Sequence, residues 1–475
     1  MSGEWETVVG LEVHCELRTR TKLFCACPNV FGEEPNTNVC PVCLGLPGSL
    51  PVLNEEAVEL AMRIGAALHA EVRPSSFHRK NYFYPDMPKD YQISQYDEPI
   101  NVGGHLDLPD GSRVGIVRAH LEEDTGKTAH LGETGRIHAA DYSLVDYNRS
   151  GVPLVEIVSE PDIRSAAQAR AYAAELRAVL VATGASDGKM EEGSMRVDAN
   201  VSVRRAGAEL GTRCEIKNLN SLRSLARAVE HEAARQVALL EAGGVVVQET
   251  RHWDEQAGRT ISMRSKEEAF DYRYFPEPDL VPLAPDEAWR QRAAAAVGRL
   301  PAERRRGLAG LVGEPTPAQV DQVQAVVDLG LDELVVAAVS AGAPATLALA
   351  RAANELASDL EAALALDPGS FAALVVLEAR GELTATQSKA VLAELVAAGG
   401  GDPVSIAAAR GFESLSDDSL RDVVGQLIEA NPGEWGRFCE GEDKLAGFFT
   451  GQVMKATGGK ADGKAVAAEL RRRRN

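Results

Sequence analysis

Apolar and polar residues alternate strictly in the stretch VGLEVHCEL near the N-terminus. The apolar set is Val9, Leu11, Val13, Cys15 and Leu17, and the set between them is Gly10, Glu12, His14 and Glu16. Successive side chains of a strand point to opposite faces, so this pattern predicts a half-buried β-strand. Its open face would carry glutamates on both sides of a histidine.

Three further stretches, VRAHLEE, RVDANVSVR and RCEIK, show the same alternation of apolar and polar residues and predict strands of the same kind. Their apolar positions are Val117, Ala119 and Leu121, then Val197, Ala199, Val201 and Val203, then Cys214 and Ile216. The residues between them are Arg118, His120 and Glu122, then Arg196, Asp198, Asn200, Ser202 and Arg204, then Arg213, Glu215 and Lys217. The last two stretches flank the short loop AGAELG, which predicts a hairpin with Asp198 and Glu215 on one face.

The pattern changes near residue 290. Before it, strand patterns mix with amphipathic helices such as 165–184, whereas 290–370 contains no aromatic residue and is rich in Ala and Leu at helical spacing. Three glycines at 399–401, followed by Asp402 and Pro403, then break the helical pattern. We therefore expect an α+β domain over 1–290, an all-helical domain over 291–404 and a small helical tail over 405–475. Ser416 is the expected N-cap of a tail helix.

The charge balance limits the partners that the whole surface can attract. Lys and Arg number 50 against 70 Asp and Glu, a net charge of −20, which excludes a broad basic coat for indiscriminate nucleic-acid binding. A local basic site remains compatible with this balance. The chain starts without a basic, apolar leader and has no run of about 18 apolar residues, so we expect a cytoplasmic protein without a membrane span.

Four of the seven cysteines lie within 25–43. Cys25 and Cys27 form one close pair, twelve residues follow, and Cys40 and Cys43 form a second pair. This spacing predicts a zinc-binding insertion, in which thiolates fill all four positions and the metal is structural. The alternative is a set of four buried, reduced cysteines.

The polar residues of the predicted strands suggest a second metal. Alternate residues on one face of a strand lie about 7 Å apart, so a carboxylate and an imidazole two positions apart can converge on one cation. Ligation rich in oxygen suits Mg²⁺, which usually also contacts substrate phosphates. The alternative is a solvated sheet face without a ligand.

Longer motifs make a family resemblance apparent. They are GLEVHCEL, RKNYFYPDMPKDYQISQYDEPI, LEEDTGK, VDYNRSGVPLVEIVSEPD, MEEGSMRVDANVSV, EIKNLNS and DYRYFPEPDL. Together they resemble the B subunit of bacterial aspartyl/glutamyl-tRNA amidotransferase over about the first 285 residues, and GQVMKATGGKAD resembles the tail of the same family. The resemblance implies a cradle-shaped catalytic domain with a largely antiparallel sheet, then a helical domain and a tail that holds tRNA.

The resemblance also implies site residues. The metal ligands of the family correspond to Glu12, His14, Glu123, Asp198 and Glu215, with Glu122 adjacent. Alternation places Glu122 on the open face, so Glu122 and Glu123 both stay candidates. The expected contacts to phosphate are Arg149 and Lys217.

The implied reaction uses ATP and Mg²⁺ to activate the side-chain carboxylate of Glu-tRNA(Gln), Asp-tRNA(Asn) or both as an acyl phosphate, which ammonia then attacks. The sequence shows no Gly-Gly-Ser-Ser amidase signature and no obvious cysteine nucleophile, so ammonia must come from a partner. The family implies a heterotrimer that also holds an amidase, the A subunit, and a small protein, the C subunit. We expect tRNA binding mainly in the C-terminal domains, where basic residues gather at Lys455, Lys460, Lys464 and 471–474.

Two other functions fit parts of the sequence. A free-standing ATP-dependent carboxylate-amine ligase would act on a small molecule and would not need the C-terminal domains. A zinc-containing RNA-binding scaffold would hydrolyse no nucleotide and would tolerate the loss of Asp198.

Overall fold

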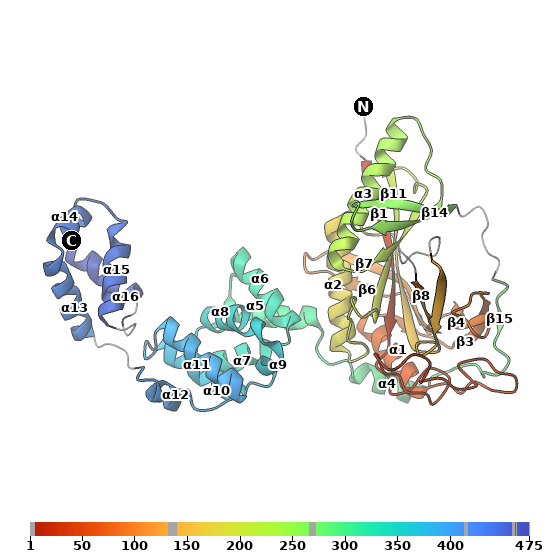
Figure 1. Cartoon of the computed structure of the whole chain (residues 1–475), viewed down its shortest axis with the longest axis horizontal. Helices are drawn as coiled ribbons and strands as arrows, with labels where there is room; N and C mark the ends of the chain where they lie inside the picture. Colours follow the sequence, from red (N-terminus) through yellow and green to blue (C-terminus); the bar gives the residue numbers. More distant parts are fainter. Residues whose placement is uncertain are drawn as a thin grey trace. The chain divides into compact units, whose positions relative to one another are not determined.

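The structure is a computed structural model that describes residues 5–131, 140–265, 272–412, 417–457, 461 and 463–474. The chain forms two compact units, of which the first ends at Ala302 and the second begins at Glu303 (Figure 1). The first unit carries all the described strands, and the second unit is helical over its described residues. The predicted α+β class, with a sheet followed by helices, is therefore confirmed.

A 13-stranded sheet forms the centre of the first unit, within the described residues. Its main order is β14-β13-β12-β11-β1-β10-β7-β4-β3-β15, and within the described residues its strands pair antiparallel except β12 with β13, which are parallel. The strands of this sheet are β1 (Trp5–Glu16), β2 (Glu71–Val72), β3 (Ser76–Asn81), β4 (Tyr91–Glu98), β5 (Asn101–Val102), β6 (His105–Asp107), β7 (Arg113–Glu123), β10 (Pro153–Ser159), β11 (Met195–Arg205), β12 (Cys214–Leu219), β13 (Glu249–Asp254), β14 (Arg259–Ser265) and β15 (Phe275–Pro276). A separate ribbon pairs β8 (Lys127–Leu131) with β9 (Tyr142–Asp146). The segment around 132–143, whose role the sequence leaves open, lies mostly outside the described residues.

Burial along β1 follows the predicted alternation. The apolar set from Val9 to Leu17 is at most 1% exposed, whereas Glu12, His14 and Glu16 are half-buried on the opposite face. The predicted hairpin is also present, since β11 pairs antiparallel with β12 and places Asn200 opposite Glu215.

Strand β7 departs from the expected pattern. Its register against β10 shifts between Val158 and Ser159, so the buried positions change parity at Val117, which is only half-buried. Moreover, His120 and Glu122 are not on an open face, because they are 0% and 4% exposed. The ring of Tyr96 lies edge-on to His120 with centroids 6.3 Å apart and covers part of this face.

Helices cover the apolar face of the sheet, as Figure 1 shows for α2 and α3. The helices of the first unit are α1 (Glu55–Ala67), α2 (Ala166–Ala182), α3 (Leu222–Glu241) and α4 (Glu287–Ala295). The predicted helix after residue 165 is confirmed, with the Ser165 side chain accepting a hydrogen bond from the Gln168 N–H at its N-cap. Ala293 of α4 is buried in the same core, so the first unit extends past the change of pattern near 290.

Tyr172 of α2 offers a test of this core. Its ring is fully buried, and among the described residues its hydroxyl has no hydrogen-bond partner. A buried, unpaired hydroxyl costs about 1–3 kcal/mol, so Tyr172→Phe is expected to raise the free energy of unfolding by about 1 kcal/mol. Tyr147→Phe is the matched control and should destabilise, because the Tyr147 hydroxyl donates to the Pro85 carbonyl at 2.7 Å. Chemical denaturation of both variants measures the difference, and a loss of stability in Tyr172→Phe would contradict the expectation.

The second unit contains two separate hydrophobic clusters. Its helices are α5 (Pro301–Val312), α6 (Pro317–Asp328), α7 (Asp332–Ser340), α8 (Ala345–Glu355), the short 3₁₀ helix η2 (Leu356–Ser358), α9 (Leu360–Leu364), α10 (Pro368–Ala379), α11 (Ala385–Ala398), α12 (Pro403–Ala409), α13 (Asp417–Ala430), α14 (Pro432–Cys439), α15 (Leu445–Ala456) and α16 (Gly463–Arg474). One cluster runs from Leu308 to Ala407, and the other runs from Leu420 to Leu470. The glycine break lies between α11 and α12, and Gly399 ends α11 in the left-handed conformation. The expected cap Ser416 lies outside the described residues.

None of the described helices is by itself long and apolar enough to cross a membrane. The pair Ala385–Ala398 and Pro403–Ala409 meets the length and composition test only when taken together, with a bend of 116° between the two helices.

Candidate functional site

One row of polar side chains crosses four neighbouring strands on the face of the sheet opposite the helices. In β1, His14 lies opposite Arg196 of β11 on one side and Glu156 of β10 on the other. Glu156 in turn lies opposite His120 of β7. The antiparallel register therefore brings into one row residues that are far apart in the sequence.

The imidazole of His14 is the centre of a carboxylate cluster. Its Nε2 atom lies 3.7 Å from Glu12, 3.6 Å from Glu122 and 3.6 Å from Glu156. Two overlapping groups have ligand atoms within 4.8 Å of one another, and both include His14. The groups are Glu12, His14 and Asp198, and His14, Glu122 and Glu156. We call these five residues the His14 cluster.

Lys217 of β12 borders the cluster. Its ammonium lies 2.7 Å from Asp198 and 3.2 Å from Glu215, and the Thr250 hydroxyl donates to Glu215 at 2.8 Å. Burial opposes the charge of Lys217, but Asp198 and Glu215 outweigh it and raise the pKa of Lys217 above its ordinary value. Lys217 is therefore a fixed cation next to the cluster, and it joins Glu215 to Asp198.

The cluster concentrates negative charge away from water. Burial, together with the charge of Glu156, raises the pKa of Glu12 and raises that of Glu122 to about 7. Burial would lower the pKa of His14, but Glu156, Glu122 and Glu12 outweigh it and raise the value to about 9. A cation between carboxylates that lie this close would reduce their mutual repulsion and favour their charged forms.

Two further observations fit a bound cation and an anionic ligand. Among the described residues, both ring nitrogens of His120 and the Nε atom of Arg118 are buried without a hydrogen-bond partner. Burial also lowers the pKa of His120 to about 4, so its imidazole is neutral at pH 7. The donor set of the His14 cluster is mainly carboxylate oxygen, which is the ligand type that Mg²⁺ prefers.

Glu123 lies apart from the cluster. Its carboxylate pairs with the buried ammonium of Lys89 and accepts the Ile93 N–H at 2.9 Å. The geometry thus brings Glu122, and not Glu123, to His14.

Arg149 lies beside a different carboxylate. Its guanidinium donates to the carbonyls of Thr125 and Gly126 at 3.0 and 2.9 Å, and it lies 3.5 Å from Asp124. Asp124 also accepts from Arg196 at 2.9 Å. Burial opposes the charge of Asp124, but the two arginines hold the pKa of this carboxyl below its ordinary value.

Glu156 and Asp124 are site residues that the strand patterns did not single out. Glu156 interrupts the apolar run VPLVEIV, in which both faces of β10 are buried, so no alternation marks it. The available signal was a single charge inside a run of apolar residues. A charge at such a position needs a partner, and His14 and Arg118 provide it at 3.6 and 3.2 Å.

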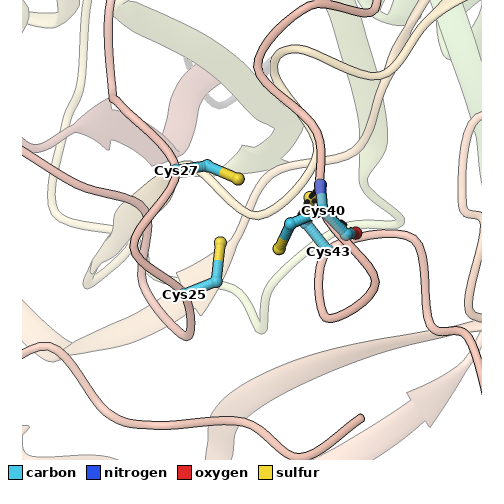
Figure 2. A group of neighbouring side chains, drawn as sticks. All are labelled: Cys25, Cys27, Cys40 and Cys43. Atoms are coloured by element: carbon cyan, nitrogen blue, oxygen red, sulfur yellow. Dashed lines mark hydrogen bonds between the residues drawn. The ribbon is translucent and has the colours of Figure 1, made fainter.

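The four cysteines of the insertion gather as predicted. Cys25, Cys27, Cys40 and Cys43 have sulfur atoms within 4.8 Å of one another, and all four are free thiols. Figure 2 shows side chains from two loop segments turned toward a common centre. Burial raises the pKa of Cys27 to about 11, whereas the contact with Cys25 lowers that of Cys43 to about 5. The group could hold a metal ion.

Comparisons with known proteins show similarity to one family over nearly the whole chain. The family model described as "GatB/GatE catalytic domain" matches residues 7–291, and the model described as "GatB domain" matches residues 334–473. A protein of Salinispora arenicola, named as the B subunit of aspartyl/glutamyl-tRNA(Asn/Gln) amidotransferase, is 51% identical, over 97% of this chain and 95% of that protein. Proteins with the same name from Nocardia farcinica and Mycobacterium bovis BCG are each 50% identical over 97% of this chain, and over 94% and 93% of their own lengths. The family resemblance predicted from the motifs is confirmed, and the chain belongs to the family of aspartyl/glutamyl-tRNA(Asn/Gln) amidotransferase B subunits.

Proposed function

We propose that the polar face of the sheet activates the side-chain carboxylate of glutamate or aspartate on a misacylated tRNA, Glu-tRNA(Gln) or Asp-tRNA(Asn). ATP would supply the phosphoryl group, and ammonia would then displace phosphate from the acyl phosphate. The observation that carries this proposal is the His14 cluster with Lys217 at its border. It offers acidic ligands for a cation and fixed positive charge for phosphate oxygens on one surface.

The chemistry explains why both charges are needed. A carboxylate is a poor electrophile, and phosphorylation gives it a leaving group. Mg²⁺ bound by Glu12, His14, Glu122, Glu156 and Asp198 would neutralise charge on the phosphates of ATP. Lys217, held in place by Asp198 and Glu215, would add a cation toward the transferred phosphoryl group.

The other predicted site residues take supporting positions in this proposal. Glu215 orients Lys217 at 3.2 Å, and we assign it no direct contact to the metal. The guanidinium of Arg149 is held by Asp124 and two backbone carbonyls, and its remaining N–H groups would contact phosphate. We retain Glu122 as the ligand in preference to Glu123, because Glu123 pairs with Lys89.

The four cysteines would bind Zn²⁺ in a structural role. Thiolates from both close pairs would fill a tetrahedral shell, which leaves no open position for a reacting group. Zinc would replace the thiol protons and neutralise part of the charge of four thiolates whose sulfur atoms already lie within 4.8 Å of one another.

The proposed reaction needs a partner protein that supplies ammonia, because the sequence shows no amidase signature and no obvious cysteine nucleophile. We propose that a glutaminase, the A subunit, supplies ammonia and that a small protein, the C subunit, is the third member of a heterotrimer. Misacylated tRNA(Gln), tRNA(Asn) or both would be the acceptor.

Reconstitution of the heterotrimer tests the proposed function. The three proteins, ATP, Mg²⁺ and glutamine would be supplied with Glu-tRNA(Gln) or Asp-tRNA(Asn), and the released amino acid would be identified after deacylation. We expect amide formation and ATP cleavage that depend on the charged tRNA. Amidation of free glutamate or aspartate at a comparable rate would instead identify a small-molecule ligase.

Loss of the tail domain should weaken tRNA binding. The truncated protein should end at Phe412, because α12 and Phe412 pack against the hydrophobic cluster that runs from Leu308 to Ala407. Removal of 413–475 also removes Lys455 and the arginines at 471–474, so we expect the KM for tRNA to rise several-fold. Lys460 lies outside the described residues, as does the side chain of Lys464. An unchanged KM at moderate salt would show that tRNA is held elsewhere.

A further inference from the structure

A groove between α2 and α3 carries an unbalanced group of arginines. It has a volume of about 630 Å³ and is lined by Arg170 and Arg177 of α2 and by Arg223 and Arg227 of α3. Asn220 and Ser221 line it at the start of α3. We call these four arginines and the space between them the arginine groove.

Part of this positive charge is uncompensated. Within the part of the chain that the structure describes, Arg170, Arg177 and Arg223 are exposed and lie in no ion pair within 4 Å. Arg227 is paired with Glu255 at 2.5 Å, and the charge of Arg223 also acts on this carboxylate. Two carboxylates line the groove against four guanidinium groups. Such a surplus in a chain of net charge −20 indicates a surface that attracts an anion.

The backbone adds to this potential. Helix α3 is 20 residues long, begins next to the groove and has no acidic residue in its first turn. The positive end of its dipole is therefore not compensated by its own side chains. This contribution is secondary to the four arginines.

The position of the groove relates it to the candidate active face. Strand β12 carries Glu215 and Lys217 and continues directly into Asn220 and α3. Asn220 lies three positions after Lys217, which corresponds to about 10 Å along a strand. Helices α2 and α3 cover the sheet face opposite the polar row, so a long anionic substrate whose reacting end lies beside Lys217 would contact the groove by passing around this end of β12.

We propose that the arginine groove binds the sugar-phosphate backbone of the substrate tRNA near its aminoacylated end. This inference rests on the proposed function, because it assumes that the aminoacylated end lies beside Lys217. Guanidinium groups match phosphate with two parallel donors, and phosphate contacts position RNA without reading its sequence. Tight protein interfaces usually centre on Trp, Tyr or Arg anchors, and among the described residues no aromatic side chain lines this groove, whose apolar residues are Met190, Leu222 and Ala226.

The test measures tRNA affinity of the reconstituted heterotrimer as a function of KCl. Arg177→Ala combined with Arg223→Ala should reduce the slope of log Kd against log salt by about two, one for each lost phosphate contact. The KM for charged tRNA should rise at least about tenfold at 0.1 M salt, with kcat within threefold of the wild-type value. Replacement of the same two residues by lysine should restore most of the salt dependence, since the charge remains.

Arg213→Ala is the matched control, because Arg213 is exposed and precedes the opposite end of β12. It should leave affinity and salt slope unchanged. Wild-type affinity and slope in the double variant would overturn the inference. Loss of a partner protein on gel filtration with unchanged tRNA binding would also overturn it and would assign the groove to a protein. Failure of the wild-type heterotrimer to amidate would count against the proposed function alone, because tRNA binding is measured separately.

Discussion

His14→Ala is expected to reduce tRNA-dependent ATP cleavage and amidation by at least about a hundredfold without unfolding the chain. The imidazole is the one side chain shared by both candidate metal groups, so its removal disrupts the whole cluster. It also leaves Glu122 and Glu156 close together without the imidazole nitrogen that lies 3.6 Å from each of them. The apolar core under β1 is formed by the opposite face of the strand and remains intact.

Asp198→Ala should give the same loss by a different route, because it removes both a candidate ligand and the partner of Lys217 at 2.7 Å. His105→Ala is a suitable control, since His105 stacks on His69 outside the polar face. ATP cleavage in the presence of charged tRNA measures the chemical step, and circular dichroism checks folding. Near wild-type rates in a folded His14→Ala or Asp198→Ala variant would mean that this face is a solvated surface without a catalytic metal.

Local patterns predicted the parts of the site whose geometry lies within one strand or one hairpin. The parity of β1 placed Glu12 and His14 on the same face, and the short loop between β11 and β12 placed Asp198 and Glu215 on one face, where Lys217 contacts both. Both inferences depend on residues that are close in the sequence. The cysteine spacing predicted the gathering of the four thiols for the same reason, because each pair lies within four residues.

Other features of the site depend on long-range pairing that no local pattern contains. Glu156 joins His14 because β10 inserts between β1 and β7, a strand order that follows from the topology of the whole sheet. The register shift opposite Val158 changes which residues of β7 are buried. His120 is buried in a face to which Tyr96, from another strand, contributes an edge-on ring contact. Alternation therefore identified a polar face but not how deeply its residues are buried.

Cys40→Ser is expected to lower zinc content and thermal stability together. Loss of an outer-shell partner of a metal site typically lowers metal affinity about 10- to 100-fold. Loss of a thiolate ligand itself should therefore lower zinc affinity by at least about a hundredfold. Hydrogen bonds also hold the second cysteine segment, among them the Lys22 ammonium, which donates to the Asn38 carbonyl at 2.8 Å, the Asn38 N–H, which donates to the Asn148 side chain at 2.8 Å, and the Ser150 hydroxyl, which donates to the Cys43 carbonyl at 3.3 Å. Loss of the metal should therefore remove the link between the two cysteine pairs without releasing either segment, and Tm should fall by several degrees.

Cys439→Ser is the matched control, because Cys439 is an exposed free thiol outside the four-cysteine group. It should change neither zinc content nor Tm. The cysteines and the His14 cluster share no residue, so the folded fraction of Cys40→Ser should keep its rate of ATP cleavage per active site. Metal analysis alongside thermal denaturation checks both points. A stable Cys40→Ser protein with a full complement of zinc would contradict a four-thiolate site, and loss of activity in its folded fraction would mean that the cysteine group also shapes the active face.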